Sequence, residues 1–114
     1  MDKNIVMLEG RISSTIKRAK TKESKEYLKF MLAINSYSKD VHDSSEQRND
    51  ILLPLLVFDK RIVTYLEHVG ARCGNRVSIL ARLNSYKEED EKGNIIHHTC
   101  IIARDVQVLK TKKE

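Results

Sequence analysis

The chain has 114 residues, of which 40% are hydrophobic and 32% are charged, a composition that excludes both a disordered chain and a membrane-embedded one. The longest nearly apolar run, residues 51–58, contains a proline and is far shorter than the ~20 residues that a transmembrane helix needs. Two cysteines, Cys73 and Cys100, are too few for a disulfide framework, and no secretory signal is visible at the amino terminus. We therefore expect a cytoplasmic protein with no membrane partner.

The positive charge is concentrated in one segment. The formal net charge of the chain is +5. Residues 11–29 hold seven basic and two acidic residues, so the net charge of this segment equals that of the whole chain. Residues 37–50 are acidic in balance, and residues 110–114 form a short basic tail. A polyanion is the partner that this distribution indicates. A solvated lysine-rich loop would explain the same pattern.

The first strand is predicted at residues 4–13, where Gly10 marks a bulge or a close approach of another backbone. A lysine-rich loop, residues 14–26, follows. Residues 27–37 alternate between apolar and mixed side chains, which is typical of a half-buried antiparallel strand. The apolar face of this second strand consists of Leu28, Phe30, Leu32 and Ile34.

A long loop is predicted at residues 38–50 and a third strand at residues 51–58, which are apolar on both faces. Pro54 places this strand at an edge or a bulge, because proline cannot donate a hydrogen bond to a ladder. The doubly apolar character is consistent with a buried contact between subunits, and a covering helix would explain it equally well.

A single helix is predicted at residues 59–70, with Asp59 as its N-cap and Gly70 at its end. Four apolar residues at helical spacing give it one buried stripe. They are Ile62, Tyr65, Leu66 and Val69.

A fourth strand is predicted at residues 75–86 and a fifth at residues 95–109, joined by a hairpin turn at residues 87–94. The order of these elements is that of the OB-fold, an all-β, five-stranded Greek-key barrel with one helix between strands three and four. We expect this domain to span residues 1–109. In such a barrel the outer face of strands two and three, with the neighbouring loops, binds oligonucleotides.

A surface that binds single strands needs cations along the phosphates and flat rings on which bases stack. The alternation of the predicted strands places both on outward faces, and the lysine-rich loop adds further cations. For Phe58 the two apolar faces of its strand leave a core role and a stacking role equally open. The candidate nucleic-acid-binding residues are Arg11, Lys17, Arg18, Lys20, Lys22, Tyr27, Lys29, Tyr37, Phe58, Arg76, Arg82 and Tyr86.

Catalysis and metal binding are not indicated. No nucleophile elbow, phosphate-binding loop or H-E-x-x-H pattern is present. His97 and His98 are adjacent, so on a strand they point to opposite faces, and Cys100 shares only the side of His98. Because a zinc site needs three or four convergent ligands, we expect no metal, no cofactor and no enzymatic activity.

Four segments, taken in order, resemble bacterial single-stranded DNA-binding proteins. They are the opening strand at residues 4–12, the second strand at residues 27–35, the third strand with its exit at residues 55–62, and the strand at residues 73–83. Gly93 and Asn94 resemble the tip of the family's last hairpin. The resemblance covers residues 4–109 and implies sequence-independent binding of single-stranded DNA in replication, recombination or repair. It also implies a homo-oligomer, usually a tetramer, and a nucleoid-associated location.

The chain departs from the family pattern at several positions. Ala81 replaces a family glycine, and the chain has no tryptophan. Tyr37 and Tyr86 stand near two of the family's aromatic positions, Leu52 stands near a third, and Phe58 matches the stacking phenylalanine. The family's acidic tip, which recruits repair and replication enzymes, is not seen. The primosomal PriB proteins, which also lack the acidic tail and have few aromatic residues, imply an alternative: a dimeric protein-interaction module with weak single-strand binding. Neither reading separates DNA from RNA.

Overall fold

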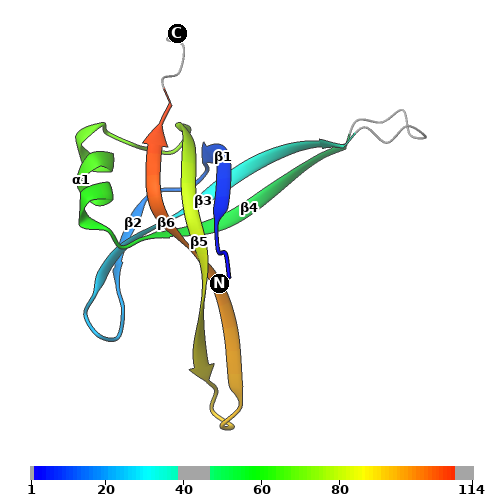
Figure 1. The fold of residues 1–114 in the computed structure, drawn as a ribbon, viewed down its shortest axis with the longest axis vertical. Helices are drawn as coiled ribbons and strands as arrows, with labels where there is room; N and C mark the ends of the chain where they lie inside the picture. The colour runs from blue at the N-terminus through cyan, green and yellow to red at the C-terminus, as the bar shows by residue number, and fades with distance from the viewer. Residues whose placement is uncertain (1, 39–46, 110–114) are drawn as a thin grey trace.

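A computed structural model describes residues 2–38 and 47–109, with the backbone alone described at residues 36–38 and 47–49. The described strands form one sheet in the order β1-β5-β6-β4-β3-β2, and an additional pairing of β1 with β3 closes it into a barrel (Figure 1). Most neighbours are antiparallel, whereas β4 and β6 pair in parallel. The elements are β1 (Val6–Ile12), β2 (Lys17–Lys20), β3 (Glu26–Ser38), β4 (Gln47–Val57), α1 (Lys60–His68), β5 (Arg76–Glu89) and β6 (Ile95–Val108).

The predicted OB-fold is confirmed, with two corrections to its strands. The segment predicted as a lysine-rich loop contains the short strand β2, and β4 begins at Gln47 rather than at Ile51. Both additions are polar segments that pair with β3. Because no apolar alternation marks such segments, period-two patterning could not find them. The rest of the predicted 38–50 loop, residues 39–46, lies outside the described residues.

The core fills the barrel from the inward faces of its strands. The predicted apolar face of β3 is buried at Leu28, Phe30 and Leu32, and Ile34 packs against the same cluster. Ile12 of β1, alternate residues of β4 and β5, the helix α1, and two residues of β6 also belong to it: Leu55, Val57, Ile62, Leu66, Val77, Ile79, Ala81, Ala103 and Val106. Ala81 is fully buried, so the alanine that replaces a family glycine contributes to the core.

Helix α1 lies against the barrel beside β6 (Figure 1). The side chain of Asp59 caps it by accepting a hydrogen bond from the backbone N–H of Arg61 at 2.9 Å, as predicted. Gly70, just beyond its end, has a φ of +68°. Tyr65 is half-buried against the core, and its hydroxyl oxygen accepts a hydrogen bond from the N–H of Val108 at 2.9 Å. The helix therefore also fixes the end of β6.

Gly10 permits the barrel to close. Its neighbour Arg11 pairs with Arg76 of β5 on one side and with Ala33 of β3 on the other. A Cβ at position 10 would overlap the carbonyl oxygen of Ala33. The predicted close approach is confirmed, and it lies where one strand serves two partners.

Two hairpin arms extend from the barrel, one formed by β3 and β4 and the other by β5 and β6 (Figure 1). The β5–β6 arm starts where β5 leaves the core, and every residue of β5 from Arg82 to Glu89 is exposed. A tight turn closes it, in which the carboxylate of Asp90 accepts hydrogen bonds from the N–H groups of Lys92 and Asn94. These bonds, chiefly that from Asn94, hold the pKa of Asp90 below its usual value.

Pro54 lies in β4 opposite Met31. It precedes Leu55 and Leu56, the two residues through which β4 pairs with β6. At Pro54 the one described strand paired with β4 is β3. The missing N–H therefore costs β4 no hydrogen bond to β6.

Candidate nucleic-acid interface

A row of directly paired residues crosses five strands on the outside of the barrel. Lys17 of β2 stands opposite Lys29 of β3, which stands opposite Leu56 of β4. Leu56 is paired with Ile102 of β6, and Ile102 with Arg82 of β5. We call these five residues the outer row. It joins the cations of the first basic segment to a cation far away in the sequence.

The pairing of Lys17 with Lys29 places two ammonium groups on one face of adjacent strands. Like charges directly opposite each other destabilise a sheet. Both side chains are exposed, and within the described ranges no carboxylate forms an ion pair with either of them. A polyanion laid across the row would relieve this repulsion.

An aromatic pair lies beside the two lysines. The rings of Tyr27 and Phe58 have centroids 5.0 Å apart and are tilted by 33°, which is an attractive geometry for aromatic rings. The ammonium of Lys25 stands 5.4 Å from the centre of the Phe58 ring, within cation–π range. Both rings are half-buried, and neither belongs to the core cluster. We call Lys25, Tyr27 and Phe58 the aromatic corner.

The ambiguity over Phe58 is resolved by the faces of β4. Leu55 and Val57 are fully buried in the barrel, whereas Leu56 lies in the outer row. Phe58 follows β4 with the parity of Leu56 and contacts Tyr27, so it belongs to the outside of the barrel. Its half-exposed ring is available for stacking.

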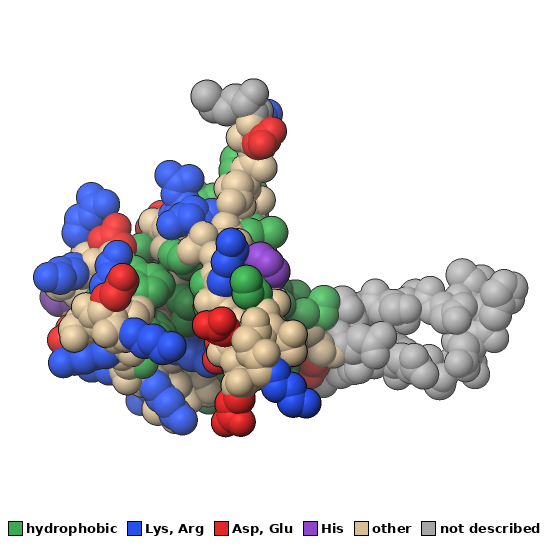
Figure 2. All heavy atoms as spheres, turned by 90° about the horizontal axis from the view of Figure 1, so that it is seen from below, with side chains coloured by type: hydrophobic (Ala, Val, Ile, Leu, Met, Phe, Trp, Pro, Cys, Tyr) green, Lys and Arg blue, Asp and Glu red, His purple; other side chains and the backbone are tan. Residues whose placement is uncertain are grey.

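The connection between β2 and β3 carries further lysines. Lys22 is exposed in the turn that joins the strands. Lys20 stands opposite Glu26 at the end of β2, on the face of β2 opposite to Lys17. The hydroxyl oxygen of Thr21 accepts a hydrogen bond from the N–H of Lys25 at 3.1 Å, which fixes the turn. Figure 2 shows lysine and arginine side chains gathered on this side of the molecule, over β2 and α1.

Arg11 and Arg76 lie on outward faces of the barrel, as expected. Arg11 is opposite Ala33, which is on the same face of β3 as Lys29, so it borders the outer row. Arg76 donates a hydrogen bond to Glu9 at 2.9 Å and forms an ion pair with it. Arg11 is therefore the better placed of the two for a phosphate.

Arg18 points away from the other candidates. It is paired with Leu28, whose side chain is in the core, so it occupies the opposite face of β2 from Lys17. There its guanidinium forms ion pairs with Glu67 of α1 and with Glu26. These ion pairs tether β2 to the helix and set Arg18 apart from the candidates of the outer row.

The β5–β6 arm carries a second pair of rings. Tyr86, which is 52% exposed, is directly opposite His98, and their rings are stacked with centroids 4.8 Å apart. Nε2 of His98 lies 2.7 Å from Oε1 of Glu88. Tyr86 was a predicted site residue and His98 was not. The signal that could have identified His98 is its cross-strand register with Tyr86, which the length of the hairpin turn determines.

Two aromatic positions of the expected surface remain to be placed. Tyr37 lies in β3 opposite Arg48, but its side chain is outside the described part of the structure. Leu52 is 57% exposed on β4 opposite Ala33, on the outward face. It adds apolar surface there and cannot stack as an aromatic ring does.

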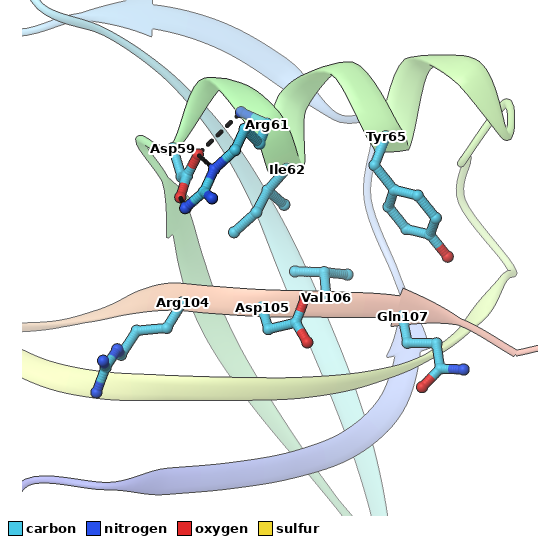
Figure 3. Close-up of a pocket in the computed structure, with 8 residues that line it drawn as sticks. All are labelled: Asp59, Arg61, Ile62, Tyr65, Arg104, Asp105, Val106 and Gln107. Atoms are coloured by element: carbon cyan, nitrogen blue, oxygen red, sulfur yellow. Dashed lines mark hydrogen bonds and ion pairs between the residues drawn. The ribbon is translucent and has the colours of Figure 1, made fainter.

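A separate open pocket of about 550 Å³ lies between α1 and β6 (Figure 3). Asp59, Arg61 and Tyr65 line it from the helix side, and Arg104 and Gln107 from the strand. The hydrogen-bonded guanidinium of Arg61 lowers the pKa of Asp59, and the two groups largely neutralise each other. None of the twelve candidate residues lines this pocket.

Within residues 2–38 and 47–109, no three His, Cys, Asp or Glu side chains are grouped so that they could hold a metal ion. Cys100 is partly buried, and this burial raises the pKa of its thiol. In the same part of the chain, no helix is long and apolar enough to cross a membrane.

The barrel and its outward cations and rings define the class: an OB-fold domain with a nucleic-acid-binding surface. Residues 3–109 match the model of the single-strand binding protein family, and the chain belongs to this family. Its members are DNA-binding proteins rather than enzymes. No curated protein sequence matches the chain.

Solved structures share the fold. A Plasmodium falciparum SSB in complex with ssDNA superposes with a TM-score of 0.77 at 23% identity, over 96% of this chain and 97% of that one. The mitochondrial single-stranded DNA-binding protein Rim1 of Saccharomyces cerevisiae gives 0.69 at 22% identity, over 96% and 98%. A small single-stranded DNA-binding protein of Streptomyces coelicolor gives 0.63 at 15% identity, over 95% of each chain.

Proposed function

We propose that this protein binds single-stranded DNA without sequence preference, by stacking bases on exposed rings and by pairing cations with phosphates. The observation that carries the proposal is the aromatic corner beside the paired lysines of the outer row. These are the two elements that a sequence-tolerant single-strand surface requires. Family membership supports the same function, which serves replication, recombination and repair. Nucleoid association would follow from this binding.

The strand path suggested by this surface runs along the outer row. It begins at the aromatic corner, passes Lys17 and Lys29, crosses the apolar pair Leu56 and Ile102, and reaches Arg82. Phosphates pair with the cations, and bases contact the rings and Leu56, whereas Ile102 is only 9% exposed. The outer row consists of three cations and two apolar residues and offers no amide or hydroxyl group to a particular base edge, so all four bases are accepted.

The protein acts as a homo-oligomer. Ile5, Met7 and Leu80 are exposed apolar side chains at β1 and β5, and Met7, which is 79% exposed, is directly opposite Leu80. Exposed apolar side chains gathered in this way mark a contact surface. Leu80 is two residues from Arg82 on the same face of β5, so a second copy seated here would border the Arg82 end of the outer row. Two or four subunits both remain compatible with this arrangement.

The proposal is tested by fluorescence anisotropy with a labelled oligo-dT strand and with a duplex of the same length. We expect saturable binding of the single strand at low salt and much weaker binding of the duplex, whose bases cannot reach the rings. Replacing both Tyr27 and Phe58 with alanine should weaken single-strand binding by about tenfold or more, because a stacked base contributes about 1–3 kcal/mol. The matched control is Tyr65→Phe on α1, which should bind like the unmodified protein.

Absence of single-strand binding at low salt would contradict the proposal. It would favour the PriB-like alternative, in which the barrel binds replication proteins. An oligo-rU strand of equal length, measured in parallel, decides between DNA and RNA.

A further inference from the structure

The stacked rings of Tyr86 and His98 form a surface on the β5–β6 arm that extends the proposed site. The two residues are directly paired across the strands, and their ring planes are inclined by only 21°. Stacking covers one face of each ring. The remaining exposure, 52% for Tyr86 and 36% for the side chain of His98, therefore lies on the other faces and on the edges.

Glu88 holds the imidazole of His98 in this orientation. Its carboxylate oxygen is 2.7 Å from Nε2, a hydrogen-bonding distance. Glu88 is two residues from Tyr86 along β5, and His98 is directly across from Tyr86 on β6. All three side chains therefore lie on the same side of the arm. The imidazole is therefore fixed between a ring and a carboxylate, rather than free to rotate.

This side of the arm is continuous with the outer row. Arg82, the last residue of the row, precedes Tyr86 by four residues on the same face of β5, about 13 Å along the strand. A strand of DNA that leaves the row at Arg82 thus meets the two rings next. Beyond them the arm ends in the acidic residues Glu88, Glu89 and Glu91, which repel phosphates. The rings are therefore the last favourable contact in this direction.

We propose that His98 is a DNA-contacting residue, an inference that rests on the proposed function. One unpaired base stacks on the free face of the imidazole and so continues the Tyr86–His98 stack, and Glu88 sets the plane of the imidazole. Because the imidazole is already held in place, it suits a position near the outer end of the site.

The test compares His98→Leu, His98→Phe and His97→Leu in oligo-dT titrations at low salt. His97 is the matched control, because it is one residue away and on the opposite face of the arm. We expect His98→Leu to weaken binding at pH 7.5 by about fivefold, the lower end of the loss of one stacked base. His98→Phe should bind like the unmodified protein, because it retains a ring, and His97→Leu should be unchanged.

If His98→Leu folds poorly, which circular dichroism would show, His98→Gln takes its place as the variant without a ring.

Equal affinities for the variant without a ring and for His98→Phe would overturn the inference, since a ring would then contribute nothing. That result with normal binding by the unmodified protein leaves the proposed function intact, whereas failure of the unmodified protein to bind would remove both.

Discussion

Tyr27 and Phe58 reach the same corner from β3 and from the end of β4. The ring of Phe58 contacts that of Tyr27 and has the ammonium of Lys25 5.4 Å from its centre, and it lies outside the core although it follows the fully buried Val57. A base that stacks here must displace or share the cation. The corner is therefore a joint surface in which the contribution of one ring depends on the other.

This dependence predicts non-additive losses. Tyr27→Ala and Phe58→Ala should each weaken oligo-dT binding. The binding free energy lost in the double variant should be smaller than the sum of the two single losses, by at least about 0.5 kcal/mol, because contacting residues couple. Titration of the four proteins at one salt concentration gives the coupling energy. Strict additivity would indicate that the rings act on separate bases.

At the scale of elements, α1 shows how a local charge pair supports the fold. Asp59 caps the helix and pairs with the guanidinium of Arg61 at 3.1 Å. The hydrogen bonds from Arg61 lower the pKa of Asp59 from its ordinary 3.8. A depressed folded-state pKa means that the stabilisation is fully present above about pH 3.8 and is lost as the pH falls through the folded value.

Asp59→Ala should therefore lower the melting temperature at pH 7 by about 4 °C, the effect of a lost N-cap in a domain of this size. The difference from the unmodified protein should shrink as the pH is lowered below 3.8, since protonated Asp59 no longer attracts Arg61. Thermal melts followed by circular dichroism across this range measure the difference. A gap that stays constant down to pH 2.5 would show that the charge of Asp59 plays no part.

The elements also show how far sequence patterns reach. Apolar alternation correctly predicted the buried face of β3, because burial leaves a period-two signal. It gave no account of Arg18, which differs from Lys17 by one position on the polar strand β2 and so faces α1. Patterning separates two faces only where one of them is apolar.

The candidate surface was predictable in its residue types and less so in its geometry. Outward rings and cations could be recognised from alternation, whereas the outer row depends on the parallel register of β4 with β6. That register is set by closure of the barrel between segments far apart in the chain. His98 was missed for a related reason, because its partner is fixed by pairing across the hairpin.

At the scale of the whole molecule, the positive charge is unevenly available. Lys17 and Lys29 face each other without a carboxylate among the described ion pairs, while Arg18 and Arg76 are neutralised by Glu67 and Glu9. The net charge of +5 therefore understates the field on one side of the barrel and overstates it elsewhere. Binding should depend on where a cation lies, more than on how many the chain has.

Salt dependence tests this distribution. If about four phosphates are neutralised, log K should fall against log salt with a slope near −2.8, or about fiftyfold between 50 and 200 mM. Replacing Lys17 and Lys29 by glutamine should reduce the steepness by about 1.4, whereas Arg18→Gln should leave it unchanged. Equal effects of the lysine and arginine substitutions on the slope would show that only total charge matters.

Gly10 touches neither the rings nor the lysines, yet the molecule leaves no room there for even a methyl group. A survey of tolerated substitutions would find position 10 as restrictive as any binding residue. The intolerance of position 10 to substitution would result from closure of the barrel, where β1 pairs with both β5 and β3, and not from a contact with DNA.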